Sequence, residues 1–190
     1  MKLQTILPAV TASAFLAGAL STSAGAATTS PSGPKIRIVT TAGTIVAVLD
    51  PVHAPKTTAN FLHYVDRKFF NGGTFFRAIP GFVIQGGNKT KENGAGDRPI
   101  ALEDPKKTGL LNMDGSLAMA RTSDPDTATS EFFIDDGRQT ALDGPPGGPG
   151  YAVFGHVLSG MDVVRKIARL PAETEMLTTP VTIVKVVRTK

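Results

Sequence analysis

One short stretch of the chain places a single cation among aromatic and branched residues. Residues 75–88 read FFRAIPGFVIQGGN, in which Arg77 lies in a strand-like run that is broken at Pro80-Gly81. Strand alternation predicts that Phe75, Arg77 and Ile79 share one face. An arginine fixed on such a face can donate hydrogen bonds to a bound carbonyl or amide. The alternative is an amphipathic strand whose Arg77 stem lies on the core while its charged head reaches water.

Other groupings that could do chemistry are incomplete. His53, His63 and His156 lie in no recognisable nucleophile motif, and we interpret each as structural. The acids in residues 124–126 and 135–136 lack the third ligand and the glycine of a calcium loop. The chain has no cysteine, which excludes a thiolate nucleophile, a disulfide framework and a cysteine zinc site. We therefore expect no metal and no cofactor.

Length and composition predict one globular domain. The chain has 190 residues, of which 41% are hydrophobic, and this is enough to bury a sizeable core. Its 20 glycines and 14 prolines are spread along the sequence, which favours a β-rich fold with many turns. The net charge is +4, and no basic run is longer than Lys106-Lys107. Such scattered charge is not a nucleic-acid surface.

The N-terminus predicts export. Lys2 precedes a mainly apolar stretch from Ile6 to Leu20, and the small residues 24–26 fit a cleavage site near Ala26. We expect a signal peptide at 1–26, a flexible lead-in at 27–34 and the folded domain at 35–190, with the mature protein periplasmic or secreted. A retained membrane anchor is the weaker alternative, because the apolar stretch is short and interrupted by polar residues.

The remaining pattern predicts many short strands and two helices. Residues 89–111, 121–130 and 143–150 are polar or rich in Pro and Gly, and we expect loops there. Such a ratio of strands to helices favours a closed antiparallel barrel or a sandwich with helices over its open ends. The expected strands are 35–41, 44–49, 115–120, 131–134, 151–157 and 181–187, beside the run at 75–88, and the expected helices are 55–70 and 161–170.

Several motifs, in this order and at these spacings, resemble the cyclophilin family of peptidyl-prolyl cis-trans isomerases. They are FFRAIPGFVIQGG, GSLAMA, TSEFFI, and the LDG, YAVFGHV and GMDVV blocks that follow. The resemblance covers nearly all of the chain after the predicted signal. It implies a mainly β fold, a closed eight-stranded antiparallel barrel capped by two α-helices, with the substrate groove on its outer face. It also implies an isomerase that needs no cofactor.

The resemblance also assigns roles to residues of this sequence. It implies that four residues are catalytic. Three lie in the FFRAIPGFVIQGG stretch and one in the EFFI segment, and they are Arg77, Phe82, Gln85 and Phe133. It implies contacts to the proline ring, the substrate backbone and the far wall of the pocket from Val83, Ala120, Arg121, Glu131, Leu142 and Tyr151.

Three positions depart from the pattern common in that family. Glu131 stands where glutamine is usual, and its carboxylate either orients Arg77 by a salt bridge or holds the guanidinium away from substrate. Ala141 stands where the best-known members carry tryptophan, which predicts weak cyclosporin binding. Tyr151 stands where many members have histidine, and it keeps an aromatic ring with a polar tip.

The expected function is acceleration of X-Pro isomerisation in unfolded exported proteins. The alternative is a binding module that grips proline-containing segments as a chaperone or assembly factor, with incidental catalysis or none. The expected partners are proline-containing peptides, without nucleic acid or a stable membrane anchor, and we expect a monomer. The sequence leaves the client proteins and the preference for the residue before proline open.

Overall fold

The computed structural model describes residues 32–87 and 98–189 of the chain. The predicted signal peptide, most of the predicted lead-in and the start of the predicted loop at 89–111 lie outside these ranges. Within them, no helix is long and apolar enough to span a membrane.

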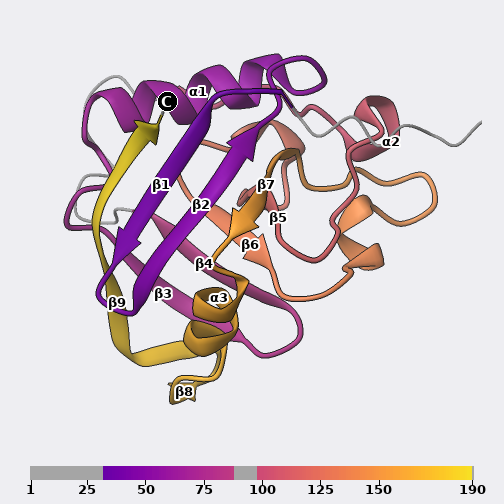
Figure 1. Cartoon of the computed structure of the whole chain (residues 1–190). Coiled ribbons are helices and arrows are strands. Elements are labelled where there is room, and N and C mark those ends of the chain that lie inside the picture. The colour runs from indigo at the N-terminus through magenta and orange to yellow at the C-terminus, as the bar shows by residue number, and fades with distance from the viewer. Residues whose placement is uncertain (1–31, 88–97, 190) are drawn as a thin grey trace, which may run out of the picture.

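The strands close into an antiparallel barrel (Figure 1). Eight strands follow one another in the order β1-β2-β7-β5-β6-β4-β3-β9, and β1 pairs with β9 to close the ring. The predicted eight-stranded barrel is therefore confirmed, and the sandwich alternative is wrong. The bounds are β1 Lys35–Thr40, β2 Gly43–Leu49, β3 Thr74–Ile79, β4 Val83–Gly87, β5 Ser116–Met119, β6 Phe132–Asp135, β7 Val153–Ser159 and β9 Met176–Thr189.

Two helices cover opposite ends of the barrel (Figure 1). Helix α1 spans Pro55–Asp66 and begins with the proline that favours a first helical position, while α3 spans Met161–Ala168. Each buries its apolar face in the barrel core, through Phe61 and Val65 on α1 and through Val164 and Ile167 on α3. Both are shorter than the predicted helices, because their last residues form turns.

A short helix and a short strand were not predicted, and neither were the 3-10 turns Pro125–Thr127 and Thr140–Asp143. Helix α2, Pro105–Thr108, lies in the segment expected to be an irregular loop; the Asp104 side chain accepts from the Lys106 amide, and Gly109 ends the helix at φ 76°. Strand β8, Ala172–Glu173, pairs with the start of β9. The prediction of two helices therefore holds for the two that cap the barrel and misses α2.

A bulge at Phe76 interrupts the alternation that was predicted for β3, the strand that carries Arg77. Phe75 pairs with Gly86, and Arg77 pairs with Gln85. Between these two pairs β3 has one extra residue, Phe76, whereas Gly86 and Gln85 are consecutive on β4. The prediction that Phe75 shares a face with Arg77 is wrong, because Phe75 lies in the barrel core. Its ring packs against Gly86, where a Cβ atom would lie 2.8 Å from the Phe75 ring. The bulge thus lets one strand fill the core and still present Arg77 outside.

The residues Pro80-Gly81 form the turn between β3 and β4. Ile79 pairs with Val83, and the Phe82 amide donates to the Ile79 carbonyl at 3.0 Å. Gly81 has φ 73°, and its amide donates to the Asp136 carboxylate at 2.9 Å. This contact ties the hairpin to the segment after β6.

Candidate active site

Strand pairing lines up a row of residues across the outer face of the barrel. Arg77 on β3 lies opposite Gln85 on β4, and Gln85 lies opposite Phe133 on β6. Phe133 in turn pairs with Ala118 on β5, which pairs with Val153 on β7. Directly opposed side chains on one face are in contact range. The row therefore runs from a guanidinium, through an amide, to a cluster of apolar side chains.

This cluster, which we call the pocket because the resemblance places the proline ring on it, is separate from the barrel core. Four of its residues are buried, and five more pack against them from the rim. All the apolar residues expected in the site belong to it, and the structure adds three that sequence reasoning missed, Leu110, Ala118 and Val153. The buried members are Val83, Ala118, Phe133 and Val153, and the rim is Phe82, Leu110, Ala120, Leu142 and Tyr151.

Arg77 is held from two sides. Its Nη1 donates to Gln85 Oε1 at 3.2 Å, its Nε donates to Glu175 Oε2 at 2.9 Å, and its Nη2 lies 2.7 Å from that same oxygen. A guanidinium has five N–H groups. Within the described residues these contacts engage three of them and leave one N–H on each terminal nitrogen. The Arg77 side chain is 27% exposed, so these donors remain within reach of a ligand.

Glu131 reaches Arg77 through Gln85. The Gln85 Nε2 donates to Glu131 Oε2 at 2.7 Å, which turns the Gln85 oxygen toward the arginine. A carboxylate accepts only, so it fixes which end of the amide faces it. This geometry favours the orienting role for Glu131 over the restraining one.

Glu175 was not identified from the sequence. It lies 98 residues from Arg77, at the tip of the short β8–β9 hairpin. Arg77 pairs with Met176 on β9, and the neighbouring Ala78 amide donates to the Glu175 carbonyl at 2.9 Å. Glu175 could have been found as an acidic residue in the tight turn before β9, the strand that pairs with β3.

Arg121 fixes one wall of the pocket. Its guanidinium lies 4.4 Å from the centre of the Tyr151 ring and donates to the Gly150 carbonyl at 3.1 Å. The Tyr151 ring also packs edge-on against the Phe133 ring, with 5.6 Å between the two ring centres. The Arg121 side chain therefore holds the loop before β7.

A buried acid lies beside the pocket, where Asp135 on β6 pairs with Val83 on β4. Both carboxylate oxygens of Asp135 are buried without a hydrogen-bond partner in the described part of the chain. Burial raises the pKa of Asp135 to about 8, with repulsion from Asp143 and Asp114 opposed by Arg138. Burial also acts on Asp143, but hydrogen bonds from Asn112 and Arg138 lower its pKa. Near neutral pH, Asp135 is therefore mainly protonated and Asp143 is ionised.

The histidines lie apart from this site. His53 contacts Asp50 at 2.8 Å, His63 contacts Arg67 at 3.2 Å, and His156 is exposed on β7. Among the described residues, no group of three or more His, Asp or Glu could hold a metal ion.

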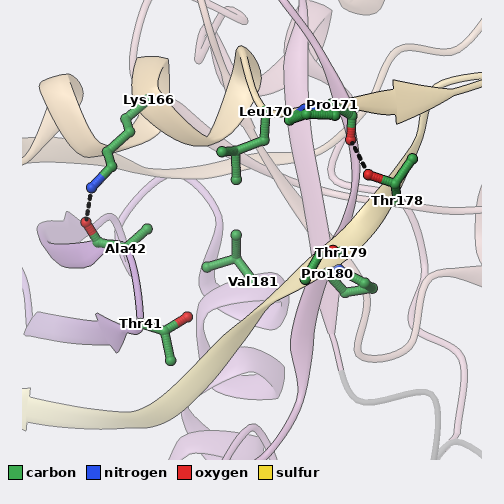
Figure 2. A pocket seen from close by; sticks show the side chains of 9 residues that line it. All are labelled: Thr41, Ala42, Lys166, Leu170, Pro171, Thr178, Thr179, Pro180 and Val181. Atoms are coloured by element: carbon green, nitrogen blue, oxygen red, sulfur yellow. Dashed lines mark hydrogen bonds between the residues drawn. The ribbon is translucent and has the colours of Figure 1, made fainter.

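A second hollow lies where α3 faces the β1–β2 turn and the bend of β9 (Figure 2). Lys166 on α3 donates to the Ala42 carbonyl at 3.3 Å across one side of it, and Thr178 donates to the Pro171 carbonyl at 3.1 Å on the other. None of the predicted site residues lines this hollow, and we assign it no part in the site.

Comparisons with known proteins show the family to which the chain belongs. Residues 35–188 match the family described as cyclophilin type peptidyl-prolyl cis-trans isomerase/CLD. Peptidyl-prolyl cis-trans isomerase A of Dickeya dadantii is 40% identical over 148 residues, which cover 78% of this chain and 76% of that protein. A peptidyl-prolyl cis-trans isomerase of Acinetobacter baylyi is 42% identical over 139 residues, covering 73% of this chain and 74% of the relative.

A solved structure gives the same result. The crystal structure of a Cryptosporidium parvum cyclophilin type peptidyl-prolyl cis-trans isomerase in the presence of the dipeptide Ala-Pro matches with a TM-score of 0.70. It is 26% identical, and the match covers 82% of this chain and 99% of that one. The chain therefore belongs to the cyclophilin-type peptidyl-prolyl cis-trans isomerase family and is a peptidyl-prolyl isomerase.

Proposed function

We propose that the row of paired residues from Arg77 to Val153 catalyses isomerisation of X-Pro bonds. The pocket residues hold the proline ring while Arg77 donates a hydrogen bond to the proline nitrogen. The reaction breaks no covalent bond, since its barrier of about 18–20 kcal/mol is the loss of amide resonance on twisting. In the twisted state the nitrogen becomes pyramidal and gains a lone pair. A fixed donor favours that state over both planar ones.

One observation carries this mechanism. Arg77 is anchored by Gln85 and Glu175 and keeps one N–H on each terminal nitrogen free of partners within the described residues. Gln85 pairs with Phe133, at the buried centre of the pocket. A proline ring packed on Phe133 therefore brings its nitrogen toward the edge of the guanidinium that can still donate.

The required rate enhancement is within reach of such a site. A turnover near 10³ per second corresponds to a barrier of about 13 kcal/mol, so the site must supply roughly 5–7 kcal/mol. A preorganised donor is worth a few kcal/mol, and orientation of the substrate adds the rest.

The proposed setting is outside the cytoplasm. Its support is the sequence of residues 1–26, with an apolar stretch and small residues near Ala26. Unfolded exported proteins with slow X-Pro steps would be its clients. Mass spectrometry of the protein recovered from a periplasmic or culture fraction tests this, because an intact Met1 end would contradict export with cleavage.

The test of the mechanism is a cis-to-trans assay on a short X-Pro peptide. Arg77→Ala should lower kcat/KM by about 10²- to 10³-fold. Arg37→Ala, at an exposed arginine of β1, is the matched control and should keep the full rate. Equal rates for Arg77→Ala and the unmodified protein would overturn the proposed role of Arg77.

A further inference from the structure

The β8–β9 hairpin brings a carboxylate to the edge of Arg77 that faces away from Gln85. Glu175 Oε2 takes both the Nε donor at 2.9 Å and the Nη2 nitrogen at 2.7 Å, while Gln85 takes Nη1. Two contacts to one carboxylate and a third to an amide define the plane of the guanidinium. A single contact would leave it free to rotate.

The hairpin that carries Glu175 is itself fixed. At its base, both the amide and the hydroxyl of Thr178 donate to the Pro171 carbonyl, at 3.0 and 3.1 Å, and Figure 2 shows the hydroxyl contact. Leu177 anchors the start of β9 in the barrel core. At the tip, the Glu175 carbonyl accepts from the Ala78 amide. The backbone of Glu175 is therefore tied to the residue that follows Arg77.

The turn adopts a backbone conformation that its residues disfavour. Thr174 has φ 48° and Glu175 has φ 71°, a left-handed pair that glycine or asparagine would adopt at lower cost. Non-glycine residues persist in such conformations where surrounding contacts hold them, and these places often serve function. Here the strained residue is the one whose side chain reaches Arg77.

We propose that Glu175 is a positioning residue for isomerisation, which fixes the guanidinium of Arg77 so that its remaining N–H groups face the pocket. This inference rests on the proposed role of Arg77. The carboxylate occupies the Nε side of the guanidinium and leaves a donor on each terminal nitrogen. Glu175 thus completes, from the opposite side, the orientation that Glu131 and Gln85 begin.

Substitutions at the turn test this on the intact mature protein. Glu175→Ala should lower kcat for an X-Pro peptide by about tenfold and change KM by no more than about twofold. The reason is that the Arg77 guanidinium would still contact the substrate but would be misaligned in the transition state. Glu175→Gln, which keeps an acceptor oxygen, should recover part of that loss. Thr174→Gly is the matched control: it relieves the turn, keeps the carboxylate, and should keep the full kcat.

Two further measurements separate positioning from a general structural effect. The NMR signal of the Arg77 Nε–H should exchange faster with water in Glu175→Ala, while the melting temperature changes little, because the Glu175 side chain is 52% exposed. In an Arg77→Ala background, Glu175→Ala should cause no additional loss of kcat.

The outcomes distinguish this inference from the proposed mechanism. An unchanged or raised kcat in Glu175→Ala, with Arg77→Ala still impaired, would overturn the positioning role alone. Full activity of Arg77→Ala would instead remove the mechanism on which the inference depends.

Discussion

Gln85 on β4 donates to Glu131, the residue before β6, at 2.7 Å, and this contact decides which end of the Gln85 amide faces the guanidinium. Because the bond needs only an acceptor, glutamine at position 131 can replace the carboxylate.

Glu131→Gln should therefore keep kcat/KM within about threefold, whereas Glu131→Ala should lower it, since the Gln85 amide is then free to flip. The peptide isomerisation assay measures both. A large rise in Glu131→Gln would mean that the carboxylate restrains Arg77.

Arg121→Lys should weaken substrate binding more than it slows the reaction. The lysine cannot both lie flat on the Tyr151 ring and hold the carbonyls of Gly150 and Pro149. We expect KM to rise about tenfold with kcat nearly unchanged, as loss of uniform binding predicts. Tyr151→Phe keeps the ring and serves as the control. A loss confined to kcat would contradict the wall-fixing role.

Asp135 should make stability fall as pH rises. Its pKa is raised from the ordinary 3.8 to about 8, so between these values the folded state holds a proton that the unfolded state has released. The stabilisation that the raised pKa of Asp135 contributes is fully present below pH 3.8, and it is lost as the pH rises toward about 8. The free energy of unfolding should decline by up to about 1.4 kcal/mol per pH unit in this window.

Urea unfolding across that pH window measures this decline. Asp135→Asn should flatten the curve, while Asp162→Asn, at an exposed carboxyl on α3, should leave its slope unchanged. An equally steep decline in Asp135→Asn would assign the pH dependence to another group.

Ala141→Trp should tighten cyclosporin binding. Ala141 is exposed in the 3-10 turn Thr140–Asp143, next to the pocket residue Leu142. A tryptophan there would add an aromatic wall and an N–H donor. Calorimetry should show at least about a tenfold gain in affinity, with peptide isomerisation little altered. Tight binding by the unmodified protein would contradict the expectation.

The sequence was most informative where chemistry lies in one continuous stretch. Arg77, Phe82, Val83 and Gln85 lie on one hairpin, and alternation along β4 alone places Val83 and Gln85 on the same face. The EFFI segment likewise identifies β6 and Phe133. The many short strands and two amphipathic segments left a barrel and a sandwich open, and the resemblance to cyclophilins selected the barrel.

What the sequence did not show depends on strand register. The bulge at Phe76 reverses the face of Phe75, whose ring packs on Gly86, and alternation cannot reveal such a bulge. Glu175 reaches Arg77 because β9 shifts register between Val181 and Met176. The raised pKa of Asp135 arises from burial near three charged residues, Asp143, Arg138 and Asp114, which strand alternation does not bring together.

Closure of the barrel by β1 and β9 leaves no long open sheet edge in the described part of the chain. Open sheet edges attract other strands and seed aggregation. In the described part of the chain, all eight barrel strands are paired on both sides, and β8, with one neighbour, has two residues. The proposed clients, which are partly folded polypeptides, would therefore find little unpaired strand backbone on this molecule with which to aggregate.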